Sequence, residues 1–182
     1  HHQGQRKGRF PPVTAPAPDP LNGLPAGTWT DDTAMTLCVL ASLTSTGRFD
    51  AEDQVRQYSA WIRTGDRSAR GEPFGLRPAV QSSIAKAAWR RGAFSGSHDP
   101  SRLDPEPLAR SAAPALYFLG DLRAAIDAAM DCARVTHQAP LLVDACRLFA
   151  AMVHEALSGA DLAGILTVHR RWPATPLKGE LV

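Results

Sequence analysis

Three consecutive oxygen-bearing side chains, Thr30, Asp31 and Asp32, stand where a Pro/Gly-rich stretch gives way to an apolar helical pattern. One interpretation is helix capping, because free backbone N–H groups and the helix dipole favour negative charge at a helix start. The other is a metal site, because two carboxylates and a hydroxyl are hard donors that suit Mg²⁺ or Mn²⁺ better than Zn²⁺. Successive helical residues point about 100° apart. Asp31 and Asp32 would therefore reach two neighbouring ions, or one would reach an ion directly and the other through water.

The elements that must position this motif are helical. Apolar residues recur at helical spacing through the rest of the chain, and glycine or proline marks most segment ends. Asp50 is expected to cap the second segment, and Gly47 and Gly65 are expected to end the first two. No segment shows the sustained alternation of a strand, so we predict an all-α fold. The expected helices are 30–46, 51–64, 79–91, 108–119, 121–135, 140–157 and 161–171.

The chain is expected to consist of an arm and one domain. Residues 1–28 are rich in proline and glycine, so they are predicted to form an extended arm outside any helix interior or central strand. Residues 29–182 are predicted to form a single helical domain.

Composition narrows the classes of function. The net charge of +2 over 182 residues argues against nucleic-acid binding through a basic patch. No apolar run is long enough to cross a bilayer, so no membrane partner is expected. The chain has three cysteines, Cys38, Cys132 and Cys146. Their number is odd, they are widely spaced, and each lies in an apolar helical segment. They are predicted to be buried free thiols of a reducing compartment, which favours a cytoplasmic location.

The amino-acid sequence around the two carboxylates is similar to the signature of a known protein family. The stretch 24–38, LPAGTWTDDTAMTLC, resembles the signature of the ADP-ribosylglycohydrolase family, which includes dinitrogenase-reductase-activating glycohydrolases and ADP-ribosyl-arginine hydrolases. The resemblance continues at 8–13, 61–75 and 136–137. It implies an orthogonal helical bundle. It also implies that Thr30, Asp31 and Asp32 ligate metal rather than only cap a helix, with Asp31 and Asp32 taking part in catalysis.

Three further positions are candidate substrate contacts by this resemblance. His137 follows Thr136 at a helix end, where it either interacts with the helix C-terminus or, like the family's Thr-His pair, faces ADP-ribose. Phe74 either stacks on a base or ribose or anchors its loop in the core. Gly75 lets the backbone approach a ligand closely, although some members carry an acidic residue there. Arg110 matches a family arginine, whereas 104–109 lacks the Gly-Asn-Gly turn of many relatives.

The resemblance implies metal-dependent hydrolysis of an ADP-ribosyl N- or O-glycosidic bond, releasing ADP-ribose from a modified protein or small molecule. Two Mg²⁺ or Mn²⁺ ions would act in the complete protein. The family's Gly-Asp-Ala-Leu-Gly-like opening and its Asp-x-Asp-Thr stretch do not occur in the sequence. We therefore expect the bundle to be truncated at both ends and incomplete for catalysis. A crystallin-like structural protein and an ADP-ribose-binding module remain alternatives, and the adjacent carboxylates argue against a purely structural role.

Overall fold

The computed structural model describes residues 14–19, 23–90 and 92–171, and within these ranges it is helical apart from loops and two isolated bridges, Asp19–Leu24 and Ser97–His137. The predicted all-α class is confirmed. Parts of the expected arm (1–13 and 20–22) and of the expected domain (91 and 172–182) lie outside the described residues. The helices are α1 (Asp31–Thr46), α2 (Ala51–Thr64), α3 (Pro78–Arg90), α4 (Glu106–Arg110), α5 (Ala112–Tyr117), α6 (Leu122–Arg134), α7 (Pro140–Leu157), α8 (Leu162–Leu166) and the 3₁₀ helix η1 (Val168–Arg171).

The first two helices begin and end as their sequences predict. The N–H of Gly47 donates to the Leu43 carbonyl at 2.9 Å, with φ at 71°. The Asp50 side chain accepts from the Asp53 N–H at 2.9 Å and caps α2, and Gly65 ends α2 with φ at 70°. These caps fix the ends of the two helices that flank the candidate site.

Two predicted helices differ from the structure. The segment 108–119 forms two short helices, because Pro114 has no N–H to donate to the carbonyl four residues earlier and the ladder cannot continue from α4 into α5. The segment 161–171 is α-helical only to Leu166 and then becomes η1. Thr167 and Val168 are β-branched and have low helix propensity, and Arg170 N–H bonds the Thr167 carbonyl at 2.9 Å in 3₁₀ fashion.

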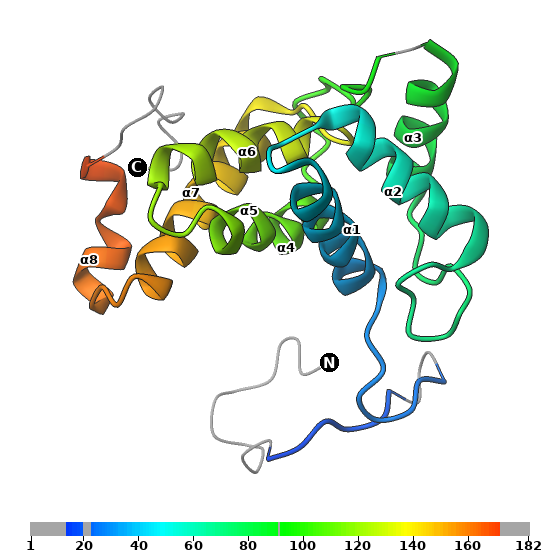
Figure 1. Cartoon of the computed structure of the whole chain (residues 1–182), viewed down its shortest axis with the longest axis horizontal. Coiled ribbons are helices and arrows are strands. Elements are labelled where there is room, and N and C mark those ends of the chain that lie inside the picture. Colours follow the sequence, from blue (N-terminus) through cyan, green and yellow to red (C-terminus); the bar gives the residue numbers. More distant parts are fainter. Residues whose placement is uncertain (1–13, 20–22, 91, 172–182) are drawn as a thin grey trace.

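The main core lies among α1, α2, α3, α5 and α6, with Tyr58 and Trp61 of α2 fully buried within it. Helix α6 packs most extensively on α7, and α5 packs on both (Figure 1). Alanines on α6 and α7, such as Ala129 and Ala150, allow close helix approach. The described part of the arm extends away from these helices (Figure 1). Cys38, Cys132 and Cys146 are buried and free, as predicted.

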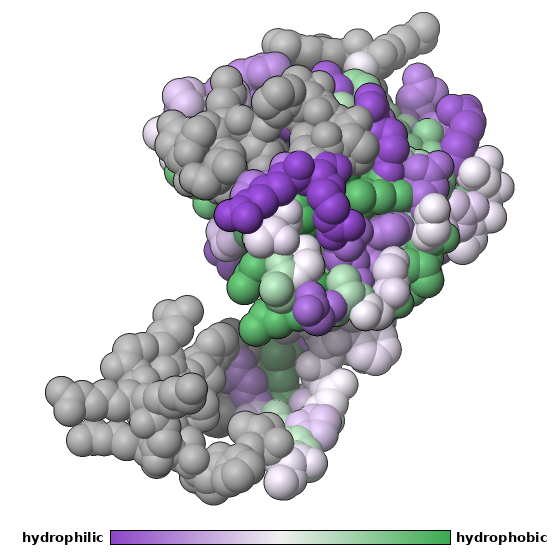
Figure 2. All heavy atoms as spheres, turned by 90° about the vertical axis from the view of Figure 1, so that its left-hand side faces the viewer, coloured by the Kyte–Doolittle hydropathy of each residue, from purple (hydrophilic) through white to green (hydrophobic). Residues whose placement is uncertain are grey.

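Apolar side chains are also exposed at the end of the molecule where α8 lies. Leu162 and Leu166 of α8 and Leu157 at the end of α7 are exposed. Figure 2 shows this face, on which hydrophobic surface is interrupted by polar residues. Within the described part of the chain, no helix is long and apolar enough to cross a membrane.

Candidate functional site

Thr30 precedes α1 as its N-cap residue, with φ −103° and ψ −170°, yet its side chain makes no capping hydrogen bond within the described structure. Its hydroxyl is therefore available to another ligand. Asp31 and Asp32 occupy the first turn of α1, where Asp31 is half-buried and Asp32 is exposed. Among the described residues, no lysine or arginine forms an ion pair with either carboxylate. The motif thus presents oxygen donors whose charge no side chain of the described ranges neutralises by contact.

The electrostatic state of Asp31 reflects this arrangement. Burial raises the pKa of its carboxyl most, and the adjacent charge of Asp32 raises it further. Backbone N–H groups at the helix start and the charge of Arg77 lower it, but the net shift is upward. A carboxyl in this state gains from a nearby cation, because the cation offsets both the burial and the repulsion.

Gly75 lies directly against this carboxyl. Its φ is +76°, and a Cβ built on it would stand 2.5 Å from Asp31 Oδ1. The indole N–H of Trp29 also donates to the Arg67 carbonyl at 3.0 Å. The structure therefore brings the loop 65–75 to the Thr30–Asp32 turn. Phe74, beside Gly75, is half-buried with the Arg70 guanidinium 5.5 Å from its ring centroid.

A second group of ionisable side chains surrounds His137. Glu106 Oε1 pairs with Arg77 Nε at 2.8 Å, and Glu106 Oε2 lies 3.3 Å from His137 Nε2. Asp104 Oδ2 lies 3.8 Å from the same nitrogen. Burial opposes ionisation of Glu106, but His137, Arg77 and Arg110 together hold the pKa of its carboxyl below the usual value. Asp104, Glu106 and His137 form a group whose ligand atoms are close enough to hold a metal ion.

Sequence reasoning missed the acidic members of this group. The resemblance marks 104–109 only as a segment that lacks the glycine turn of many relatives. The available signal was a pair of acidic residues two positions apart, Asp104 and Glu106, among prolines.

The backbone around His137 is held from several sides. The Thr136 carbonyl accepts from Ser83 Oγ at 3.0 Å, and the Gln138 N–H donates to the Ser97 carbonyl at 2.8 Å. Buried Arg110 donates to Thr136 Oγ1, which lies 2.9 Å from His137 Nδ1. A Cβ at Gly96 would collide with the backbone of His137, so only glycine permits this approach. The His137 ring is consequently fixed in place, with 2% of its side chain exposed.

A cavity of about 310 Å³ opens beside His137. Lys86 and Arg102 place positive charge on its wall. The full lining is Pro78, Ala79, Ser82, Ser83, Lys86, Ser97, Arg102, Thr136 and His137. Thr30, Asp31 and Asp32 are not among the residues that line this cavity. The two regions are instead joined through Arg77, whose charge acts on Asp31 and whose guanidinium pairs with Glu106.

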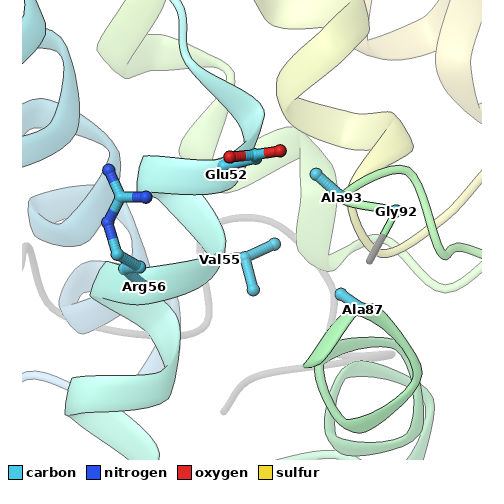
Figure 3. A pocket seen from close by; sticks show the side chains of 6 residues that line it. All are labelled: Glu52, Val55, Arg56, Ala87, Gly92 and Ala93. Carbon is cyan, nitrogen blue, oxygen red and sulfur yellow. The ribbon is translucent and has the colours of Figure 1, made fainter. Parts of the chain in front are cut away.

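Another cavity, of about 320 Å³, lies between α2 and α3 and contains no candidate residue. Figure 3 shows Val55 directed toward Ala87 across this space, whereas the Arg56 guanidinium points away from it. Arg56 pairs with Asp53 at 2.9 Å. The residues that line this cavity include one carboxylate, Glu52, and no histidine, so they do not form a group of metal ligands like those of the other two regions.

The fold and these positions agree with a known family. A family model described as ADP-ribosylglycohydrolase matches residues 2–179. The chain belongs to the ADP-ribosylglycohydrolase family.

Individual relatives support this assignment. The chain is 34% identical over 140 residues to the ADP-ribosylarginine hydrolase Tri1 of Pseudomonas putida (strain GB-1), covering 76% of this chain and 37% of that protein. It is 28% identical over 169 residues to the ADP-ribosyl-(dinitrogen reductase) glycohydrolase of Rhodospirillum rubrum, covering 86% of this chain and 53% of that protein.

A solved structure described as an ADP-ribosylglycohydrolase-related protein complex matches with a TM-score of 0.72 at 29% identity, covering 92% of this chain and 53% of that chain. The predicted family fold is thereby confirmed. The chain spans about half or less of the length of these proteins.

Proposed function

We propose that the protein hydrolyses an ADP-ribosyl glycosidic bond and releases ADP-ribose, using divalent ions held by Thr30, Asp31 and Asp32. The observation that carries this proposal is the Asp31–Asp32 pair, which no side-chain cation neutralises by contact among the described residues and which lies against Gly75. The names of the relatives support the reaction class, since two of them are a hydrolase and a glycohydrolase of ADP-ribosylated groups. An arginine-linked ADP-ribosyl group is the substrate we favour, because the relative that is 34% identical is an ADP-ribosylarginine hydrolase.

The donor set fits Mg²⁺ or Mn²⁺. All three side chains offer hard oxygens, and the Thr30 hydroxyl is not used for capping. The raised pKa of Asp31 is the expected state of a carboxyl placed for a cation. A Mg²⁺ or Mn²⁺ ion bound there supplies Lewis-acid chemistry, which makes water a better nucleophile near neutral pH.

The residues of the chain then have distinct tasks. A carboxylate has two oxygens, so Asp31 can hold an ion with one and accept a proton from the attacking water with the other. The water attacks the anomeric carbon through an oxocarbenium-like transition state while the bond from that carbon to the modified group breaks, and the proton taken up by Asp31 passes to the departing nitrogen or oxygen. Asp32, on the exposed side of the turn, adds negative charge that favours this cationic transition state. Gly75 leaves the space in which the Asp31 carboxyl stands.

We assign substrate binding to the cavity beside His137 and to the adjacent residues Phe74 and Gly75. The diphosphate of ADP-ribose is an anion, and Lys86 and Arg102 line the cavity beside His137. His137 offers a fixed imidazole on that wall. Phe74, which precedes Gly75 in the chain, has a half-buried side chain whose ring is assigned to stacking on the ribose or base. Gly75 lets the backbone approach the ligand.

The test measures release and binding together. The 182-residue chain and a longer form that spans the length of its relatives are each incubated with Mn²⁺ and ADP-ribosylated arginine, and free ADP-ribose is measured beside equilibrium binding of ADP-ribose. Because the 182-residue chain is expected to be incomplete for catalysis, efficient release is expected from the longer form. We expect metal-dependent release, reduced at least about 100-fold, or 2.7 kcal/mol, by Asp31→Asn. Asp127→Asn, at a partly exposed aspartate of α6 that pairs with Arg123 outside both regions, is the matched control and should leave release unchanged.

Two results contradict the proposal, each in favour of a different class of protein. Metal-dependent binding of ADP-ribose without release would favour an ADP-ribose-binding module. Neither binding nor release would favour a crystallin-like structural protein.

A further inference from the structure

The group around His137 has the spacing of metal ligands. His137 Nε2 lies 3.3 Å from Glu106 Oε2 and 3.8 Å from Asp104 Oδ2, and the three ligand atoms all lie within 4.8 Å of one another. Zinc binds nitrogen and oxygen at about 2.0–2.2 Å in a tetrahedron, which separates neighbouring ligand atoms by about 3.4 Å. The Glu106–His137 separation of 3.3 Å already has this value, and the Asp104–His137 separation of 3.8 Å is close to it.

Two of the three ligand atoms are buried without a hydrogen-bond partner. Glu106 and His137 side chains are 4% and 2% exposed. Among the residues that the structure describes, neither Glu106 Oε2 nor His137 Nε2 makes a hydrogen bond of standard geometry, although the two atoms lie 3.3 Å apart. Buried polar atoms are usually satisfied. A cation between these two atoms would satisfy both.

Neighbouring side chains contact Glu106 and His137 and orient the atoms that would bind the ion. Arg77 pairs with Glu106 Oε1, which leaves Oε2 directed at His137. Thr136 Oγ1 accepts from Arg110 and lies 2.9 Å from His137 Nδ1. When Nδ1–H donates to this oxygen, the lone pair of Nε2 faces Glu106, which is the tautomer that binds metals.

The chemical types of the three ligands indicate which metal ion the group would prefer. One imidazole and two carboxylates suit Zn²⁺, whereas Mg²⁺ prefers oxygen alone. Three protein ligands leave a fourth position for water. The side chain of Asp104 is 42% exposed, so the group is open to solvent on the side of this carboxylate.

We propose that Asp104, Glu106 and His137 form a zinc site that is separate from Thr30, Asp31 and Asp32. A bound ion would join the loop before α4 to the α6–α7 junction. This inference goes beyond the hydrolase proposal, and it assigns His137 a ligand role that does not depend on catalysis.

The experiment is a Zn²⁺ titration of the full chain by calorimetry in excess Mg²⁺, which occupies oxygen-only sites. Co²⁺ then replaces zinc as a spectroscopic probe. The background protein carries His1→Ala and His2→Ala, so that the terminal histidines do not contribute. We expect one Zn²⁺ per chain and intense visible Co²⁺ bands typical of four-coordinate geometry.

Variants locate the site. Glu106→Gln and His137→Gln should each weaken zinc binding at least tenfold and abolish the Co²⁺ bands. Asp99→Asn, in the same loop, should bind within twofold of the background protein. The double variant Asp31→Asn/Asp32→Asn should also retain zinc binding, even though it should lose hydrolysis, which separates this proposal from the previous one.

The variant Asp104→Asn distinguishes loss of a ligand from misfolding, because Asp104 is partly exposed. This replacement should weaken zinc binding and leave the circular dichroism spectrum unchanged. Absence of stoichiometric zinc binding in the background protein would overturn the proposal. Binding that survives in His137→Gln, or that is lost in Asp31→Asn/Asp32→Asn alone, would also overturn it.

Discussion

Gly75 and the Asp31 carboxyl are in direct van der Waals contact across two segments that are far apart in the chain. Any side chain at Gly75 would stand 2.5 Å from Asp31 Oδ1. The glycine is needed for space as well as for its φ of +76°, and these two requirements can be separated by experiment.

Gly75→Ala should destabilise the fold and displace Asp31. Positive φ costs a non-glycine residue about 1–2 kcal/mol, and the collision adds a local shift of the carboxyl. Gly71→Ala is a matched control, because Gly71 has φ +70° but an added Cβ would meet nothing within 4 Å. Both variants should unfold at lower urea concentration, whereas only Gly75→Ala should weaken Mn²⁺ binding in calorimetry. Equal Mn²⁺ affinity in both would show that the contact does not matter for metal binding.

Asp32→Asn should lower the pKa of Asp31, because it removes a neighbouring negative charge that raises it. A carboxyl whose folded pKa is raised binds more protons in the folded state, so stability falls as pH rises from the unfolded pKa through the folded pKa. The variant should show a smaller fall in the free energy of unfolding across this window. Carboxyl ¹³C NMR titration measures the pKa directly. An unchanged Asp31 titration would contradict the expected repulsion.

Arg77→Gln should affect two carboxyls at once. Arg77 lowers the pKa of Asp31 and of Glu106, so both pKa values should rise in the variant. The lowered folded pKa of Glu106 gives stability that is present above its unfolded pKa and is lost as pH falls through the folded value. This contribution should shrink by less than about 1 kcal/mol, because Arg77 is largely exposed. Arg70→Gln is the control, since Arg70 pairs with Glu72. A change in the pKa of only one of the two carboxyls, Asp31 or Glu106, would show that Arg77 does not connect the two regions.

Cys38 and Cys146 should resist alkylation in the folded protein. Burial raises the pKa of each thiol to about 11, so little thiolate exists at pH 8, and both side chains are inaccessible. Iodoacetamide labelling followed by peptide mass spectrometry should show modification only after denaturation. Rapid labelling of either cysteine under native conditions would contradict the buried assignment.

Much of the fold was predictable because the signals are local. Asp50, Gly47 and Gly65 mark helix ends through their own conformational preferences, and apolar spacing marks the faces. Local reasoning erred at 108–119 and 161–171, where Pro114 and the β-branched Thr167 and Val168 decide whether a helix continues.

The candidate site was only partly predictable for a different reason. The Thr30–Asp32 turn is contiguous, so its chemistry is visible in the sequence. The contact of Gly75 with Asp31 and the grouping of Asp104 and Glu106 with His137 depend on how distant helices pack. No spacing rule relates residue 106 to residue 137.

Arg77 stands between the two acidic regions, acting on Asp31 by its charge and holding Glu106 by an ion pair. A cation bound beside Asp31 would repel this guanidinium, and a cation bound beside Glu106 would compete with it. Each event changes the field at the other region, and thermodynamic linkage requires the two effects to be equal in free energy. A single arginine thereby gives two ion-binding regions a reciprocal influence, so that occupancy of one is measurable as altered affinity at the other.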